Sequence, residues 1–472
     1  MRPLFPSSRL GLFAGLGLLL ASSLFASAAE EYGHAEPFKN DDVVCFVGDS
    51  ITHGGTYHAM INLFYATRFP DRKVSVFNCG VGGDRAAGIM SDEPYRVNID
   101  VLGHKPTVAT IMLGMNDIGH GDYKVPSTPE IEKHKEASLA TYDAAMQKLI
   151  AALQKGGAKV ILLTPSIYDE TTKLDRARKD ITVGGNQALG TCAEKMHGWS
   201  KQYGTGLVQF HEVMNTINTR EQQKDPNFTI VGPDRVHPGP LGHFVMAYTF
   251  LKAQGMPQNV AVISVDGKTG KASGAENCTI SEEKVSATGV EFTCLEKALP
   301  MVVPREAEVA LQQVPFMAEL NREPLVVKGL AAGDYEVKID GASAGTFSAA
   351  QLEAGVDLAA NKATPQYQQS AEATKISGDR VQAGLQVRQL AAEFYGLSRG
   401  HVDVKDPAAV AKKINDRLEM AQKTGKPVDP RTQAFADTYQ QMPQREKTYE
   451  DLAAKLQQAC QPKPHRFVLT RK

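Results

Sequence analysis

The chain has 472 residues, of which 42% are hydrophobic and 22% are charged. These fractions are ordinary for a globular protein, so long disordered tracts and collagen-like repeats are excluded, and the length predicts about two or three domains. The 52 Lys and Arg residues nearly balance the 53 Asp and Glu residues, which gives a net charge of -1. Because phosphate recognition needs a basic surface, this balance argues against a nucleic-acid partner.

The first residues differ in composition from the rest of the chain. Arg2 and Arg9 precede or flank an apolar run over residues 10–25, and the run ends in Ala-Ser-Ala at residues 26–28. This pattern is typical of a secretory signal with its cleavage site, and the run is too short for most membrane-spanning helices. Residues 1–28 are therefore predicted to be a cleaved signal peptide, with a membrane anchor as the alternative. The mature protein is expected in the periplasm or outside the cell, without stable insertion in a membrane.

The cysteines suggest neither a disulfide scaffold nor a metal-binding motif. There are six of them in a long chain, and none form a CxxC pair, so zinc ribbons and thioredoxin chemistry are unsupported. Cys45 lies inside an apolar run and is predicted to be a buried free thiol. Cys278 and Cys294 flank a predicted hairpin, where an oxidising compartment would permit a disulfide.

Residues 43–255 alternate short β-branched runs with helical patterns. Near-continuous apolar strands between helices predict a parallel sheet covered on both faces, which is a three-layer α/β sandwich. The clearest helix is expected to begin after Ser127-Thr128, with Pro129 at its first position, and to end at Gly156-Gly157. The predicted strands cover residues 42–47, 73–77, 107–113, 159–163 and 206–208.

The pattern changes after Pro257. Short alternating segments and Gly-rich turns predict a small β-rich domain over residues 257–365, of the β-sandwich type. Residues 335–339 alternate strictly between polar and apolar side chains, with turn residues on both sides, which predicts a strand within a hairpin.

Residues 366–472 form a third region, rich in Ala, Gln, Glu, Lys and Arg. We expect several helices here, separated at Gly378, at Asp406-Pro407 and at residues 427–430. The charged faces of such helices are usually solvated, although an interaction module is the alternative. An apolar alternation at residues 465–470 predicts a closing strand.

Ser50 lies in the block Gly48-Asp49-Ser50, directly after the first predicted strand. A hydroxyl at the carboxyl end of a parallel strand points into the crevice where such sheets bind ligands, so Ser50 is a candidate nucleophile. The alternative is a structural helix cap, which Asp-Ser also forms after a strand.

Two further blocks follow the next strands. Residues 78–84 contain three glycines, which let the backbone approach a ligand and direct N–H groups at it, with a tight turn as the alternative. Asn116 follows the third strand within Gly114-Met115-Asn116-Asp117. Its amide is a candidate donor to a developing oxyanion, and a local Asx turn is the alternative.

A fourth block, Asp234-Arg235-Val236-His237, lies near the end of the α/β region. Here a carboxylate can hold one imidazole nitrogen while the other nitrogen takes a proton, although a surface Asp–His pair is the alternative. Together the four blocks supply a nucleophile, a base, an orienting acid and oxyanion donors. These are the requirements of acyl transfer.

In this order the blocks resemble those of the SGNH (GDSL) hydrolase family, named for its Ser, Gly, Asn and His. The resemblance covers about residues 40–255, and it implies a doubly wound α/β/α sandwich, with residues 40–256 as the catalytic domain. Gly83 matches the family's oxyanion glycine, with Gly82 as the neighbouring alternative. The residues that the resemblance marks are Ser50, Asp234 and His237 for the catalytic triad, and Ser50, Gly83 and Asn116 for the oxyanion hole.

The resemblance also implies a mechanism. His237 takes a proton from Ser50, Ser50 attacks an ester carbonyl, and water completes the second half. A histidine base predicts that the rate falls as the solution becomes acidic. Neither a cofactor nor a metal ion is expected, although a metal site formed by histidines near the blocks is the alternative. These histidines are His53, His58 and His120.

The substrate expectation rests on the stretch after Ser50. Residues 52–58 are polar and include Tyr57, whereas a groove for a long acyl chain would need an apolar lining. We therefore expect an exported carbohydrate O-acetylesterase whose partner is an acetylated glycan or another small ester. The alternatives are a lipase or lysophospholipase-type esterase, and a non-catalytic glycan-binding protein of the cell envelope.

Overall fold

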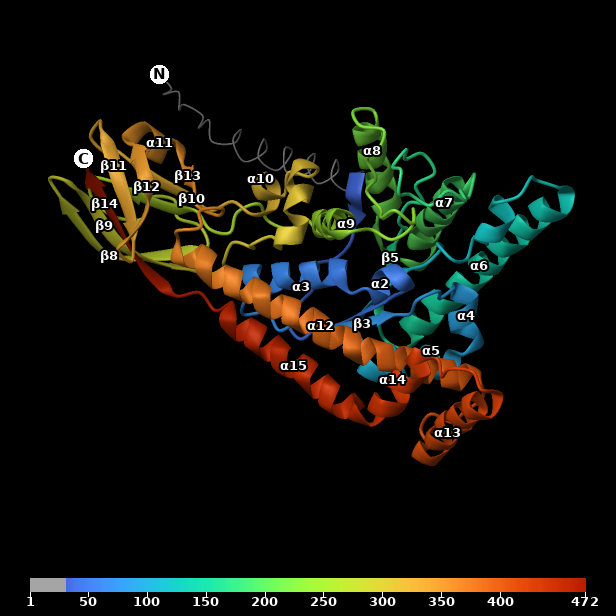
Figure 1. The fold of residues 1–472 in the computed structure, drawn as a ribbon. Helices are drawn as coiled ribbons and strands as arrows, with labels where there is room; N and C mark the ends of the chain where they lie inside the picture. Colours follow the sequence, from blue (N-terminus) through green and yellow to red (C-terminus); the bar gives the residue numbers. More distant parts are fainter. Residues whose placement is uncertain (1–30) are drawn as a thin grey trace, which may run out of the picture.

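The computed structural model describes residues 31–472, so the signal peptide expected at residues 1–28 lies outside the described residues. The first body is a six-stranded sheet packed against helices (Figure 1). Its strands are β1 (Gly33–His34), β2 (Val43–Gly48), β3 (Ser75–Gly80), β4 (Val108–Met112), β5 (Lys159–Leu163) and β6 (Gly206–Val208). Its helices are α2 (Ser50–His53), α3 (Thr56–Arg68), α4 (Ala86–Ser91), α5 (Glu93–Arg96), α6 (Pro129–Lys155), α7 (Gly185–Tyr203), α8 (Phe210–Gln222) and α9 (Pro240–Ala253).

The strand order in this sheet is β1-β6-β5-β4-β2-β3, with β2 to β6 parallel and β1 antiparallel to β6. The chain steps one way from β2 to β3 and the other way from β4 to β6. Right-handed crossovers therefore place α3 on one face and α6 and α7 on the other. The reversal beside β2 is a topological switch point, where open α/β sheets bind ligands beyond the carboxyl ends of the strands.

The strands form where the apolar runs predict them, because both faces of the sheet are buried. Val44 and the three residues after it in β2 are 0% exposed, as a covered parallel sheet requires. Strands β5 and β6 have the predicted bounds, and β2, β3 and β4 differ by one to three residues. Helix α6 begins at Pro129, after Thr128 accepts the N–H of Ile131 at 3.3 Å, and it is followed by Gly156.

Two smaller sheets form the β module, residues 263–357 and 464–471. Their strand orders are β12-β11-β14-β9-β8 and β13-β10-β7. The sheets share one hydrophobic core, to which Val265 and Val327 contribute from one sheet and Phe292 and Val337 from the other. The elements are β7 (Ile263–Asp266), β8 (Cys278–Ser286), β9 (Gly289–Glu296), β10 (Pro324–Lys328), β11 (Asp334–Ile339), β12 (Ala342–Ser348), α11 (Ala349–Ala354), β13 (Val356–Asp357) and β14 (Pro464–Arg471). Between β9 and β10, α10 (Phe316–Leu320) packs instead against the α/β body, where the Phe316 and Phe244 rings lie 5.1 Å apart.

Between β13 and β14 the chain forms the helical hairpin, residues 365–459. It leaves the β module, runs along the α/β body and returns beside itself (Figure 1). Its helices are α12 (Pro365–Arg399), α13 (Pro407–Thr424), α14 (Pro430–Thr438) and α15 (Met442–Ala459). Together with the sheets, these helices confirm the fold class expected from the sequence, a doubly wound α/β/α sandwich followed by a β-rich part and a helical segment.

The helix break expected at Gly378 is wrong, because α12 continues through this residue to Arg399. Glycine costs about 1 kcal/mol relative to alanine inside a helix, which packing readily offsets. Ser377 and Arg380 beside it are buried, so the packed stripe of the helix is not interrupted. The expected boundary at Asp406 is present, since its side chain accepts the N–H of Ala408 and caps α13.

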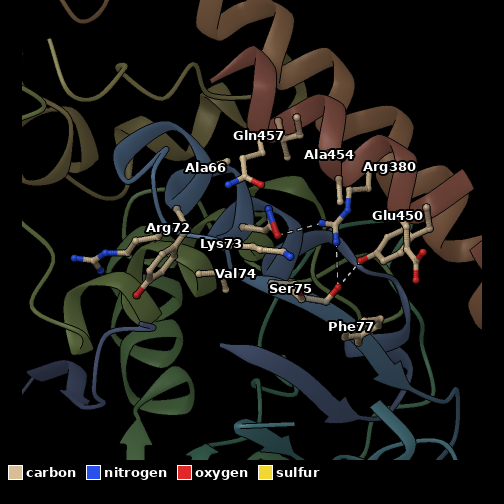
Figure 2. Close-up of a pocket in the computed structure, with 16 residues that line it drawn as sticks. Ala66, Arg72, Lys73, Val74, Ser75, Phe77, Arg380, Glu450, Ala454 and Gln457 are labelled. Carbon is tan, nitrogen blue, oxygen red and sulfur yellow. Dashed lines mark hydrogen bonds between the residues drawn. The ribbon is translucent and has the colours of Figure 1, made fainter. Parts of the chain in front are cut away.

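The hairpin covers β3, which is an edge strand of the large sheet. The Arg380 guanidinium, which Figure 2 labels, donates to Val76 O and to Asn62 Oδ1, both at 3.1 Å. The Tyr449 hydroxyl of α15 donates to the same Val76 carbonyl at 2.7 Å. A cavity of about 340 Å³ lies beside these contacts, between α3, β3 and α15. Side chains from the helices thus occupy the open edge that another strand would otherwise pair with.

All six cysteines are free thiols in the described part of the chain. Cys45 is 0% exposed, which confirms the buried thiol predicted for it. Cys278 and Cys294 lie on the neighbouring strands β8 and β9 without a disulfide between them. Across residues 31–472, no helix combines the length and the apolar character needed to cross a bilayer.

Candidate active site

Ser50 is the first residue of α2 and lies directly beyond the carboxyl end of β2. Asp49 caps this short helix, because its Oδ1 accepts the N–H of Ile51 at 3.0 Å. The cap is 2% exposed, whereas Ser50 is partly exposed. Burial raises the pKa of Asp49 to about 7. The helix cap considered as an alternative is therefore present, but Asp49 forms it. The Ser50 hydroxyl takes no part in the cap.

The Ser50 hydroxyl begins a chain of hydrogen bonds through His237 to Asp234. The distance from Ser50 Oγ to His237 Nε2 is 2.7 Å, and His237 Nδ1 lies 2.5 Å from Asp234 Oδ2. The other oxygen of Asp234 accepts the backbone N–H of His237 at 3.0 Å. Burial acts to raise the pKa of Asp234, but the hydrogen bonds from His237 outweigh it and the pKa is lowered. The carboxylate therefore stays ionised and orients the imidazole.

Arg235, which sequence reasoning missed, fixes the loop that carries this pair. Its side chain is buried, and its guanidinium donates to the carbonyls of Arg178 and Asp169, both at 2.7 Å. Its backbone adopts a φ of 70°, a left-handed conformation that costs a non-glycine residue about 1–2 kcal/mol. The guanidinium hydrogen bonds offset this strain. Nothing in the sequence distinguishes this arginine from a solvated one, since its partners are backbone atoms of a distant loop.

The loop after β3 brings backbone N–H groups beside Ser50. Gly82 donates its N–H to His53 Nδ1 at 3.2 Å, so that group is already used. The N–H groups of Gly83 and Ser50 have no partner among the described residues. Gly83 has a φ of 79°, a conformation that glycine adopts without strain. Of the two glycines that the sequence left as alternatives, Gly83 thus has a free N–H and Gly82 does not.

Asn116 follows β4, and its side-chain amide donates to Asp84 O at 3.0 Å. An amide group carries two N–H donors, so one remains for a ligand while the other fixes the side chain. Asp117 ties the two loops together, because its carboxylate accepts from Ala86 N at 2.8 Å and from Gly114 N at 3.1 Å. Burial raises the pKa of Asp117 to about 6. The sequence placed Asp117 in the block but did not predict this bridging role.

A buried network of charges lies beneath the same loop. Arg96 pairs with Asp84 at 3.0 Å and with Asp100 at 2.5 Å. Arg388 of α12 pairs with Asp100 at 2.6 Å and donates to Gly80 O at 2.6 Å. Burial acts to raise the pKa of Asp100, but the charges of Arg388 and Arg96 outweigh it and the pKa is lowered. The helical hairpin thus contacts the loop that carries Gly83, which no sequence pattern indicated.

The three histidines considered for a metal site each contact a different group of the protein. His53 accepts the Gly82 N–H, and burial is the main reason that its pKa is lowered to about 4. His58 is buried with Nε2 at 3.2 Å from Thr52 O, and His120 lies beside the Tyr168 ring. Across residues 31–472, no group of three or more His, Cys, Asp or Glu side chains is arranged to hold a metal ion.

Comparisons with known proteins identify the family to which the α/β body is similar. The model of the GDSL-like Lipase/Acylhydrolase family matches residues 46–244. An acetylxylan esterase of Geobacillus stearothermophilus is 26% identical over 225 residues, which cover 44% of this chain and 92% of that protein. The solved structure of BT4096, described as a gut microbial diltiazem-metabolizing enzyme, is 31% identical. It matches with a TM-score of 0.82 over 93% of this chain and 99% of its own.

The likeness to BT4096 extends well beyond the family domain, so the β module and the helical hairpin belong to the shared architecture. Within that architecture, residues 46–244 hold every strand from the middle of β2 to β6 and all the blocks described above. The chain therefore belongs to the GDSL-like lipase/acylhydrolase family and is a hydrolase of that family.

Proposed function

We propose that the protein is a serine esterase that removes acetyl groups from the oxygen atoms of carbohydrates. The observation that carries this proposal is the hydrogen-bonded chain from Ser50 through His237 to Asp234. His237 Nε2 takes the Ser50 proton while Ser50 Oγ bonds to the ester carbonyl carbon. The imidazolium then protonates the leaving alcohol, and an acetyl-serine remains. Water, deprotonated by His237, attacks this ester and releases acetate and free Ser50.

The oxyanion of each tetrahedral intermediate would accept hydrogen bonds from the N–H groups of Ser50 and Gly83 and from the Asn116 amide. The two backbone donors have no other partner in the described part of the chain. Asn116 is held by the Asp84 carbonyl at 3.0 Å, so it needs no reorganisation when charge develops. Loss of one such donor typically lowers the rate about 100- to 1,000-fold.

The acyl group is proposed to be acetyl because of the compounds on which two relatives act. One relative is an acetylxylan esterase and another metabolizes diltiazem. Acetylxylan and diltiazem are different molecules, but both contain an acetyl ester of a secondary alcohol. The acetylxylan esterase relative is the support for a carbohydrate as the alcohol part. The polar stretch after Ser50 adds none, because Thr52, Tyr57 and His58 are buried. We place the catalytic domain at residues 40–256, followed by a β-rich part to residue 365 and the helical segment with its last strand. An export signal would direct the protein to the periplasm or outside the cell.

Ser50→Ala tests the proposal directly. Acetate release from acetylated xylan, diltiazem and 4-nitrophenyl acetate should fall at least about 1,000-fold, because the nucleophile is lost. Labelling by a serine-reactive fluorophosphonate should disappear as well. Ser286→Ala is the matched control, since this serine is exposed on β8, far from the site in sequence.

Unchanged acetate release by Ser50→Ala would refute the proposed nucleophile. Hydrolysis of 4-nitrophenyl decanoate in preference to every acetate would move the assignment to a lipase-type esterase. Wild-type protein that neither hydrolyses these esters nor reacts with fluorophosphonate would support a binding protein.

A further inference from the structure

A groove opens beside the nucleophile, between the α/β body and the helical hairpin. Val81 and Gly82 form one wall, and residues of α12 and α14 form the other. We call this the α12–α14 groove; its volume is about 690 Å³. A Cβ atom placed on Gly82 would lie 4.0 Å from Ser50 Cβ, so the groove begins within one side chain of the reacting hydroxyl.

The size of the α12–α14 groove fits the larger part of an ester. Ligand pockets typically have volumes of about 300–1,000 Å³, whereas an acetyl group has only three non-hydrogen atoms and is held at the oxyanion donors. The alcohol part of a substrate is therefore the portion that needs this space. This argument rests on the proposed esterase function.

The floor of the groove is apolar and its rim is charged. Leu390 and Phe435 are buried at 3% and 2% exposure. The Arg431 guanidinium is exposed on α14 and has no partner among the described residues. Arg445 also lines the groove, and it donates only to neutral oxygens, Gln386 O at 3.2 Å and Gln441 Oε1 at 3.4 Å. Neither arginine is therefore neutralised by a carboxylate in the described part of the chain.

The remaining groups leave this rim positive. Glu393 is the one acidic residue among those that line the groove, so two guanidinium groups face a single carboxylate. His53 lies at the inner end of the groove, where burial, and then the charge of Arg388, lowers its pKa to about 4. It is neutral at neutral pH and adds no charge. Guanidinium groups bind carboxylates through paired, planar hydrogen bonds, and they remain charged at all physiological pH values.

We propose that the α12–α14 groove binds the alcohol part of the ester, and that Arg431 and Arg445 select alcohols that carry a carboxylate group. The apolar floor contacts the ring or carbon skeleton of the alcohol, and the arginines pair with its anionic substituent. The helical hairpin then sets the substrate specificity of a reaction that the α/β body performs.

Matched esters test this inference without a natural substrate. The first pair is 4-acetoxybenzoate and its neutral methyl ester. The second pair is 4′-acetoxybiphenyl-4-carboxylate and its methyl ester. The second ring of these compounds places the carboxylate further from the acetyl group and deeper in the groove. In the wild type, kcat/KM for the carboxylate of at least one pair should exceed that of its methyl ester about tenfold, mainly through KM. The preference should weaken as salt concentration rises, because the attraction is electrostatic.

Arg431 is exposed, and Glu393, Arg417 and Arg445 are partly exposed, so none of the variants below opens a cavity in a core. Arg431→Ala should remove most of the preference, and Arg431→Glu should reverse it, whereas kcat/KM for the neutral methyl esters should change much less. Arg445→Ala should weaken the preference further when combined with Arg431→Ala. Glu393→Gln should strengthen it. Arg417→Ala on α13 is the control, since this arginine does not line the groove.

The inference is overturned if the wild type prefers neither carboxylate, or if Arg431→Glu changes both members of a pair equally. Failure of the esterase proposal gives a different result: Ser50→Ala would then leave hydrolysis of 4-nitrophenyl acetate unchanged. A wild type that hydrolyses 4-nitrophenyl acetate through Ser50 but shows no carboxylate preference refutes the groove inference alone.

Discussion

At the scale of single residues, Asp49 combines a structural task with an electrostatic cost. Its carboxylate caps α2 through the Ile51 N–H, which positions Ser50 at the helix N-terminus. The side chain is almost completely buried, and burial raises its pKa to about 7. A carboxyl group whose pKa is raised in the folded state binds its proton more tightly there than in the unfolded chain. The folded state therefore loses stability as pH rises from the ordinary aspartate pKa of about 4 to about 7.

Asp49→Asn should remove this pH dependence and keep the cap, because the amide oxygen still accepts the Ile51 N–H. Relative to the wild type, the variant should gain up to about 4 kcal/mol in free energy of unfolding between pH 4 and pH 8. Urea denaturation at both pH values measures the difference. A difference between the two proteins that does not change with pH would show that Asp49 ionises in the folded state as it does in the unfolded chain.

The residues that the sequence indicated are those that follow strands. Ser50 and Asn116 lie beyond the neighbouring strands β2 and β4, so strand prediction alone brings them to one edge of the sheet. The contact between Ser50 and His237 spans 187 positions, so strand prediction does not give it. It was expected because the blocks together supply the groups that acyl transfer needs, and because they resemble those of a known family. Arg235 and Arg388 were not foreseen, since both bind backbone carbonyls that no sequence pattern marks.

At the scale of elements, α12 takes the place of a missing strand. The open edge of β3 presents carbonyl groups at alternate residues, and the arginines of α12 donate to three of them, Val76 O, Asn78 O and Gly80 O. Arg388 differs from Arg380 because it also pairs with the buried Asp100. The two arginines lie on one helix and contact one strand, so they form a natural comparison.

Arg388→Met should lower the free energy of unfolding by about 3–5 kcal/mol, because Asp100 is left with an incompletely compensated buried charge. Arg380→Met is the matched variant, and the loss of its hydrogen bonds should cost less, about 1–3 kcal/mol. Denaturant titrations of both proteins measure the difference. At temperatures where both variants are folded, kcat should fall more for Arg388→Met than for Arg380→Met, because Arg388 holds the end of β3 from which the Gly83 loop begins. Arg388→Lys should retain part of the kcat that Arg388→Met loses. Equal losses in both variants would contradict a special role for the Asp100 pair.

The elements that the sequence predicted well are those decided by local physics. Buried parallel strands are continuous apolar runs. Thr128-Pro129 marks the start of a helix, because threonine caps helices and proline is favoured at their first position. The length of α12 could not be predicted, because Gly378 weakens a helix locally and only packing against the α/β body decides whether the helix continues. The short antiparallel β1 was also missed, since two residues, Gly33–His34, show no periodicity.

At the scale of the whole molecule, β14 joins the parts. It lies in the middle of the five-stranded sheet, between β11 and β9, although the helical hairpin separates it from both in sequence. Phe467 of this strand is 0% exposed, and its ring stacks on Phe292 with centroids 5.1 Å apart. The first and last helices of the hairpin, α12 and α15, are therefore both attached to the β module, α12 through β13 and α15 through β14.

Phe467→Ala should destabilise the β module by about 3–5 kcal/mol, the usual cost of a large cavity. Val468→Ala on the same strand is the control, because that side chain is only partly buried and should cost about 1 kcal/mol or less. Circular dichroism follows all elements, whereas the fluorescence of Trp199, the single tryptophan, follows the α/β body. For Phe467→Ala the dichroism midpoint should move further than the fluorescence midpoint. Midpoints that move together would show that the two bodies unfold as one unit.

Because both ends of the hairpin are attached to the β module, cleavage of the chain within the hairpin should not separate the molecule. The segment between α13 and α14 is exposed, with Gly425 and Lys426 at its start, and such tips are where proteases cut most readily. A cut there would separate the sequence into two polypeptides. The longer one would keep α12 and four strands of the five-stranded sheet, and the shorter one would keep α15 and the central strand β14. The two fragments would stay together without a covalent link, with Ser50 and Arg431 carried on different pieces. The molecule is in this sense already divided into two complementary pieces of unequal length that hold each other in place.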